Sequence, residues 1–545
     1  MIRYTPASER KLSLFKTPFE NELDPANRWV RMAELVPWDD MAQVFMDQLN
    51  DRHGRPSVDL RIILGALLVK HIQGLSDEDT IDYIQENIYA QYFVGLSSFQ
   101  IEPVFVPSLF VEIRKRLGAK GADQLNVLLI KQAQDLRLIK HRRKPAKQQD
   151  QDDQGPQEKG PQADLQPGTS QTEPKKDSAD KSSNNQVACQ ADSNRGTMIV
   201  DATVAPLHIA FPTDSGLLNH AREHSEQLLD VLYESAKDLW PVKPRTYRCE
   251  ARKRYIGFSK KRNKSKKAIR KAVGQQLRYV RRNIKTLHKM LDQLQAAQFE
   301  IAWDKHQWRM FWIIQELYRQ QDLMYQDKRK RIDDRLVSLQ QPHARPIKRG
   351  KSGGKDTEFG PKINVSLSEG IARVDQIDFN AFNESQGFPA QIEAYKALYG
   401  YYPALVLADK IYWTRANRKY LKDRNIDIGG VPLGRKKEQS KYERERQRKR
   451  NNKRSEVEGK FGQAKSKYGL DNVMTRLPET IKAEIHLTFL SLNLIKMVKT
   501  TLFLFFRPLQ PHITDLSGQL KLLMIDFTTA ILNRTADQAT RLAQA

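Results

Sequence analysis

The sequence predicts a mixed α/β fold that is preceded by an all-helical amino-terminal domain and interrupted by a helical insertion after its first strand. Three observations carry this prediction. Apolar residues recur at helical spacing through the first part of the chain, two short apolar runs have the length of buried strands, and a long stretch of helical periodicity lies between those runs. A chain of 545 residues has room for three or more such units.

The helical domain is predicted to cover residues 1–137. From Asp59 to Ile72 the apolar residues fall on one helical face, and Gly74 follows as a helix stop. Ser76 then caps a second helix, with a carboxylate three residues later at Asp79. These two helices predict either a helix-turn-helix that reads DNA or an ordinary bundle with a tight turn, because the turn has no residue pattern specific to groove binding.

Residues 138–196 are predicted to form a disordered linker. They are rich in Gln, Asp, Lys, Ser, Pro and Gly and carry few large apolar side chains. Such a composition buries too little surface to offset the entropy lost on ordering.

The first strand is predicted at Met198–Asp201, and a basic helical insertion is predicted over residues 214–355. Within the insertion, Ala268 to Leu294 carries a regular apolar stripe. The start of the insertion is rich in Lys and Arg with aromatic residues among them, which suits contacts with DNA phosphates, whereas a solvated charged face is the alternative. The residues proposed to bind DNA there are Arg252, Lys253, Arg254, Lys260, Lys261, Arg262, Lys264, Lys266, Lys267, Arg270 and Lys271.

The rest of the sheet is predicted between residues 356 and 478. Lys362–Leu367 and Ile371–Ile377 alternate in polarity around Glu369-Gly370, which predicts a hairpin. Helix, strand, helix, strand and helix follow, with the second apolar run at Ala404–Asp409. Together with residues 197–213 this segment forms the predicted core, and residues 479–545 are predicted to be carboxyl-terminal helices.

The charge of the chain predicts a polyanionic partner. Lys and Arg number 91 against 65 Asp and Glu, which gives a formal net charge of +26 and a pI near 9.7. Nucleic acid is the first such partner to consider, and a merely soluble basic protein is the alternative.

The composition also bounds where the protein works. With two cysteines, neither a disulfide framework nor a cysteine-based zinc site can be assembled. The amino terminus lacks the apolar core of a secretion signal, and polar residues interrupt the apolar segment of residues 485–506, so it fits a packed helix better than a bilayer span. We therefore expect a protein of the reducing cell interior that is not associated with a membrane.

Three acids are candidates for the catalytic site. Asp201 and Asp409 each end an apolar run, and Glu458 lies on a predicted helix where Arg454 and Lys465 fall within about 40° of the same face. Phosphodiester cleavage with two divalent ions needs carboxylates that hold the ions about 4 Å apart. Oxygen ligands favour Mg²⁺ or Mn²⁺, so Asp201, Asp409 and Glu458 are predicted to bind two such ions.

Arg454 and Lys465 are predicted to grip phosphates beside the ions. Each of these features has a structural alternative. A single strand-end Asp is commonly a cap or turn residue, and an Arg four residues before a Glu is commonly an exposed helical ion pair. Tyr412 and Trp413 can stack on an exposed base or can belong to the core.

Together these motifs resemble the DDE transposases of bacterial insertion sequences. The resemblance lies in Arg-x3-Glu-x6-Lys at residues 454–465, with Asp201 in Val-Asp-Ala-Thr and Asp409 in Leu-Ala-Asp. More narrowly, residues 201–206, 358–362 and 458–470 resemble the branch that has a helical amino-terminal domain. Relatives often carry Tyr three residues before the Arg, where this chain has Asn451.

The resemblance implies a ribonuclease H-like catalytic core and an amino-terminal domain that binds the terminal inverted repeats. It also implies cleavage at the element ends and transfer of the 3′-hydroxyl ends into target DNA. The protein is then expected to act as a homodimer on DNA in the bacterial cytoplasm, associated with the nucleoid. The rivals are a structure-selective nuclease on the same core and a catalytically silent DNA-binding regulator. All three acids are present, which argues against a silent site.

Overall fold

The computed structural model describes residues 4, 6, 22–47, 58–141, 194–348, 357–430 and 440–506. The predicted linker therefore lies mostly outside the described residues, as do residues 507–545 of the predicted carboxyl-terminal helices. Among the described residues, six helices form the amino-terminal part: α1 (Arg28–Leu35), α2 (Trp38–Met46), α3 (Leu60–Gln73), α4 (Asp77–Glu86), α5 (Ile88–Val94) and α6 (Leu109–Asp135). The prediction of an all-helical amino-terminal region is confirmed for the described residues.

The predicted helix boundaries around Gly74 are correct. Asp59 caps α3 by accepting from the backbone N–H of Arg61, and Gly74 ends the helix with φ +69°. Ser76 caps α4 by accepting from the N–H of Asp79. However, the first turn of α4 carries three acids, which phosphates would repel, and its Asp77 pairs with a buried arginine of α6 at 2.7 Å. The geometry therefore favours the bundle over a DNA-reading helix-turn-helix.

The central sheet has five strands in the order β5-β4-β1-β6-β7. Strand β1 pairs antiparallel with β4 and parallel with β6, β4 pairs antiparallel with β5, and β6 pairs parallel with β7. The sheet is thus mixed, as predicted, and its strands follow the predicted order along the chain. The bounds are β1 (Thr197–Val204), β4 (Lys362–Ser368), β5 (Ile371–Asp378), β6 (Leu405–Ala408) and β7 (Asp427–Ile428).

Strand β1 extends further than its apolar run indicated. It continues to Val204, because β4 pairs with it as far as Lys362, so Asp201 lies inside the strand and not at its end. Beyond β1, the N–H groups of Ala205 and Leu207 donate to the carbonyls of Pro361 and Phe359. These bonds join the motif of residues 201–206 to that of residues 358–362.

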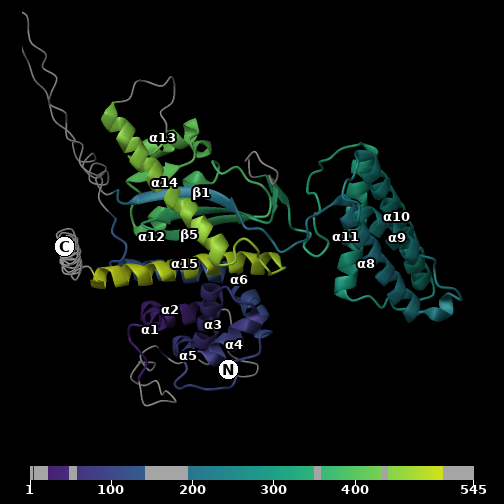
Figure 1. Ribbon diagram of the computed structural model, residues 1–545, viewed down its shortest axis with the longest axis horizontal. Coiled ribbons are helices and arrows are strands. Elements are labelled where there is room, and N and C mark those ends of the chain that lie inside the picture. Colours follow the sequence, from purple (N-terminus) through teal and green to yellow (C-terminus); the bar gives the residue numbers. More distant parts are fainter. Residues whose placement is uncertain are drawn as a thin grey trace, which may run out of the picture.

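Two helical layers cover the two faces of the sheet (Figure 1). One face packs against α12 (Phe388–Tyr399) and α13 (Arg415–Asp423), and its core includes Val200 and Val406. The other packs against α14 (Lys441–Lys467) and α15 (Pro478–Phe506), and its core includes Ile199 and Leu407. Short connections complete the core: η4 (Lys410–Tyr412) and a two-stranded sheet of β2 (Pro346–Lys348) and β3 (Thr357–Phe359).

Helix α15 lies between the sheet and the amino-terminal helices (Figure 1). Ten consecutive residues, 485–494, are buried, so this part of the helix faces protein on every side. Ile485 and Phe489 belong to the core beneath the sheet, whereas Leu487 and Leu494 belong to the core of the amino-terminal helices. The interpretation of this segment as a packed helix agrees with the structure, and among the described helices none has the length and apolarity that crossing a bilayer requires.

The predicted insertion follows β1 and stands to one side of the sheet (Figure 1). Its helices are α8 (Asp214–Ser235), η3 (Lys237–Leu239), α9 (Arg248–Ser259), α10 (Lys266–Ala296) and α11 (Lys305–Gln326). It has an apolar core of its own, which includes Leu229, Val280 and Phe311. The insertion can therefore hold its shape without resting on the sheet.

Gly360 offers a test of the junction between the two motifs. A Cβ at this position would lie 2.0 Å from the carbonyl oxygen of Ala205 and would force backbone to move. We expect Gly360→Ala to destabilise the core by about 2–3 kcal/mol, in the range of overpacked sites, as measured by thermal or urea unfolding.

The matched control is Gly459→Ala on α14, where a Cβ would meet nothing within 4 Å. It should stabilise the helix by about 0.5–1 kcal/mol, because alanine has the higher helix propensity. Equal effects of the two substitutions would contradict this description of the junction.

Candidate functional site

Asp201 and Asp409 lie side by side on one face of the sheet. Val200 pairs with Ala408 in the register of β1 and β6, so the two aspartates follow neighbouring positions. The backbone stays extended at Asp409, with φ −73° and ψ 167°. Because side chains alternate along extended chain, Asp201 shares the face of Ile199 and Asp409 that of Leu407, which is the face that α14 covers.

Helix α14, which carries Glu458, covers the same face of the sheet. Its buried residues Val457, Phe461 and Ala464 pack on the sheet and fix the helix there. Arg454 then connects two of the acids, since its Nη1 lies 3.9 Å from Oδ1 of Asp409 and its Nη2 lies 3.7 Å from Oε1 of Glu458. The predicted ion pair within the helix is present, but Arg454 also reaches a strand-end acid that lies far away in sequence.

Asp201 is the most buried of the three acids. Burial raises its pKa to about 6, and the nearby carboxylates of Glu384 and Asp409 also raise the pKa. The N–H of Ala202, which donates to Oδ1 at 2.8 Å, and the charge of Arg454 act in the opposite direction. A carboxylate held in this way gains from a cation beside it, which is the electrostatic setting that an ion site needs.

Sequence reasoning missed Glu384. It lies in the segment between β5 and α12, and its carboxylate forms an ion pair of 2.7 Å with Nζ of Lys362. It acts on the pKa of Asp201 more strongly than Asp409 does. No periodicity or motif marks this position, so only the folded chain could reveal it. Lys362, its partner, does belong to one of the motifs that carry the resemblance.

The aromatic pair after Asp409 belongs to the core. Tyr412 is fully buried and Trp413 nearly so, and both pack against Phe388. The hydroxyl of Tyr412 donates to Oδ1 of Asn364 at 2.9 Å. The core alternative is therefore correct, and neither ring is available to stack on a base.

Lys465 lies about two helical turns beyond Glu458 on α14 and is mostly buried. Its Nζ is 3.7 Å from Oε1 of Glu358 on β3, so the lysine connects α14 to the two-stranded sheet.

The predicted DNA-binding residues of the insertion are exposed on α9, on the start of α10 and on the turn between them. Arg254 among them pairs with Glu250 at 2.6 Å.

The chemistry of the three acids suits a hard divalent ion, because all their donor atoms are carboxylate oxygens. Within the described residues, however, no three His, Cys, Asp or Glu side chains are gathered closely enough to hold a metal ion. Arg454 bridges two of the carboxylates instead. The pair of Mg²⁺ or Mn²⁺ ions remains a prediction.

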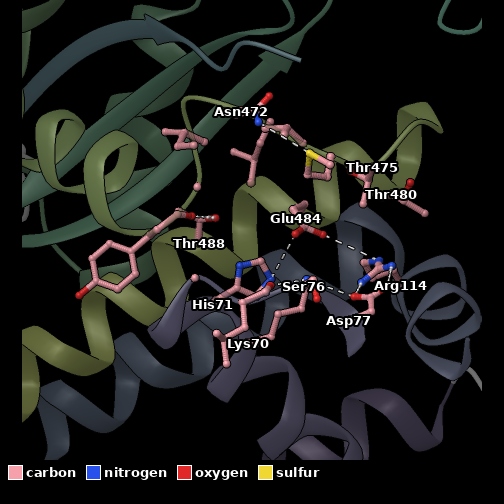
Figure 2. A pocket seen from close by; sticks show the side chains of 18 of the residues that line it. Lys70, His71, Ser76, Asp77, Arg114, Asn472, Thr475, Thr480, Glu484 and Thr488 are labelled. Carbon is pink, nitrogen blue, oxygen red and sulfur yellow. Dashed lines mark hydrogen bonds and ion pairs between the residues drawn. The ribbon is translucent and has the colours of Figure 1, made fainter. Parts of the chain in front are cut away.

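A large cavity lies elsewhere, between the amino-terminal helices and the core. It has a volume of about 930 Å³ and is lined by the ends of α3, α4 and α6, by residues 468–477 and by α15. Figure 2 shows His71, Arg114 and Glu484 facing one another across it. Arg114 donates two hydrogen bonds to Asp77, at 2.7 and 2.8 Å, and its Nε lies 3.8 Å from Glu484, so charged groups from both sides meet there.

Two family models match this chain. The model described as Transposase DDE domain matches residues 406–495, which include Asp409, Arg454, Glu458 and Lys465. The model described as Transposase domain (DUF772) matches residues 17–116, within the helical region. The resemblance to insertion-sequence DDE transposases is confirmed. Asp201 lies outside both matched segments, so its assignment to the site rests on its position beside Asp409.

A curated relative matches over a shorter stretch. It is the uncharacterised protein ORF8 in the nfe locus of Rhizobium meliloti, which is 32% identical over 124 residues. The match spans 23% of this chain and 59% of that protein. No solved structure matches the chain.

His71 provides a test of the cavity through pH. The ring is buried, and burial lowers its pKa to about 4, while Glu484 and Asp77 raise the pKa and Lys70 and Arg114 lower it. In the unfolded chain its pKa is about 6.5, so below that pH the unfolded state binds the extra proton and stability falls. We expect a loss of about 2 kcal/mol between pH 7 and pH 5 from this group, at about 1.4 kcal/mol per unit.

The measurement compares urea unfolding of the native chain and of His71→Gln at both pH values. The variant should lose less stability on acidification. His220→Gln, an exposed histidine on α8, serves as the control and should behave like the native chain. An identical pH dependence in all three proteins would contradict a neutral, buried His71.

Proposed function

We propose that this protein is a DNA transposase that cleaves at the ends of an insertion sequence and joins the freed 3′-hydroxyl ends to target DNA. The observation that carries the proposal is the placement of Asp201 and Asp409 on neighbouring strands, with Arg454 3.9 Å from Asp409 and 3.7 Å from Glu458, in or next to a segment similar to transposase DDE domains. The sheet order, with a hairpin on one side of β1 and parallel strands on the other, supports the ribonuclease H-like core that the resemblance implies.

In this proposal Asp201, Asp409 and Glu458 would hold two Mg²⁺ or Mn²⁺ ions, and the chemistry that these ions would supply is activation of the attacking oxygen and stabilisation of the leaving oxygen. The chain's own residues position the DNA. Arg454 already lies between two of the acids, and a phosphate entering the site can compete for its guanidinium. Lys465, about two turns further along α14, pairs with Glu358 and acts as a second cation beside the bound DNA strand.

The division of labour along the chain follows the predicted domains. Residues 1–137 bind the inverted repeats, residues 197–213 with 356–478 carry the catalytic core, and the basic insertion of residues 214–355 holds flanking DNA. A homodimer would hold two element ends together. The match of residues 17–116 to a second transposase domain supports a role in transposition for the helical region.

The direct test uses purified full-length protein and duplex DNA from the two ends of the element that encodes it. We expect nicking that requires Mg²⁺ or Mn²⁺, followed by joined products when a target plasmid is added. Asp201→Ala should abolish both while DNA binding persists, because the carboxylate is needed for the chemistry and not for the fold. Asp423→Ala, which removes an exposed acid of α13 in the same core, is the matched control and should retain activity.

Each rival predicts a different result. Cleavage without joined products would favour the structure-selective nuclease. DNA binding without any product that depends on a divalent ion would favour the silent regulator. Full activity of Asp201→Ala would exclude the proposed site.

A further inference from the structure

Helix α10 carries a second set of cations beyond those that the sequence motif had marked. From Lys266 to Lys289 the helix contains nine Lys and Arg residues and no Asp or Glu. Four of them belong to the basic run at the helix start, and five lie further along: Arg278, Arg281, Arg282, Lys285 and Lys289. All nine are exposed. We call these nine residues the cationic ridge.

The ridge lies on the outer face of the insertion. Leu277, Val280 and Leu287 of α10 are buried in the core shared with α8 and α11, so the cations occupy the opposite side of the helix. The last five cations line an open groove of about 420 Å³ together with Thr286. At about 1.5 Å per residue, the 23 steps from Lys266 to Lys289 span about 35 Å, which is close to one turn of duplex DNA.

Aromatic rings, more than acids, hold the ridge arginines in place. The guanidinium of Arg282 lies 4.3 Å from the ring centre of Tyr247, and Arg245 lies 4.5 Å from the same ring. Arg270 lies 4.1 Å from the ring of Tyr325. Arg281 contacts the ring of Tyr318 and also pairs with Asp322 at 3.2 Å.

This bracing matters because a ring orders a guanidinium without neutralising its charge. Side chains that are already ordered lose less entropy when they bind a phosphate. Tyr247 has φ +57°, a conformation that is rare for an aromatic residue, so the surrounding structure imposes its backbone conformation just before α9. The ridge is thus a prepared array of largely uncompensated positive charge.

We propose that the cationic ridge of α10 binds one turn of duplex DNA lengthwise through its phosphates, without reading base sequence. The inference rests on the proposed function in one respect, since that function makes the DNA next to the cut the occupant. A duplex fits better than a single strand, because the rings of Tyr247 and Tyr325 lie under guanidinium groups and so offer less surface for bases to stack on.

The first experiment compares two variants of the full chain that each lose four positive charges. The ridge variant carries Arg278→Gln, Arg282→Gln, Lys285→Gln and Lys289→Gln. The control variant carries Lys305→Gln, Arg309→Gln, Lys330→Gln and Arg331→Gln, at exposed positions of the same insertion that are not part of the ridge. Binding of a 20-base-pair duplex of arbitrary sequence is followed by fluorescence anisotropy over a series of salt concentrations, without divalent ions.

We expect the slope of log Kobs against log salt to fall by about 3.6 in the ridge variant, since each lost phosphate contact changes it by about 0.9. The control variant should change the slope by less than about 1. Equal slopes in the two variants would assign the binding to overall charge and overturn the proposal. An unchanged slope in the ridge variant would overturn it as well.

A second variant tests the bracing without changing charge. Tyr247→Ser removes the ring that holds Arg245 and Arg282, and we expect about fivefold weaker duplex binding, the loss of about one cation–π contact. Unchanged affinity would show that the rings do not prepare the ridge. These experiments measure binding and not cleavage. If the protein binds DNA through the ridge but forms no cleaved product in the nicking assay, the transposase proposal fails and this inference stands.

Discussion

The burial of helix α15 is the constraint on which the rest of the structure depends. One side of the helix completes the core beneath the sheet and another completes the core of the amino-terminal helices, so neither core closes without it. A buried Asn493 on α15 accepts from the N–H of Ala372 on β5 at 2.8 Å and donates to its carbonyl at 2.7 Å, and it also donates to Asn126 of α6 at 2.9 Å. These bonds satisfy backbone groups of the outer strand that would otherwise be buried without partners, and they fix the register of three elements at once.

The acid site follows from that arrangement. Because α14 lies on the same face of the sheet as α15, Val457 and Phe461 pack it against the strands, and Arg454 of this helix then lies within reach of both Asp409 and Glu458. Asp201 lies inside a strand. Burial there raises its pKa, and the hydrogen bond from the N–H of Ala202 lowers it. The acids are therefore placed by the packing of apolar neighbours more than by any attraction among themselves.

Charge is distributed unevenly over the molecule. At the sheet, Arg454 lies near the carboxylates of Asp409 and Glu458, whereas the insertion carries exposed cations on a bundle with its own core. A DNA-cutting protein needs both features, since phosphates must be attracted over a long surface and then brought to carboxylates that hold ions. Because the insertion has a core of its own, the repulsion among its exposed cations does not have to be offset by the packing of the sheet.

The sequence by itself determined the elements and the three acids. Periodicity predicted the hairpin, the caps at Ser76 and Gly74 and the long helix of the insertion, because these depend on local backbone preferences and on which face is apolar. Two apolar runs that end in Asp201 and Asp409, and the helical face that Glu458 shares with Arg454 and Lys465, marked the three candidate acids before any resemblance was considered. Tertiary structure alone decided that α15 joins two cores, that Glu384 stands beside Asp201 and that rings brace the arginines of α10. Those facts depend on contacts between residues far apart in sequence, which no local pattern records, since a side chain's neighbours across a core are set only when the whole chain packs.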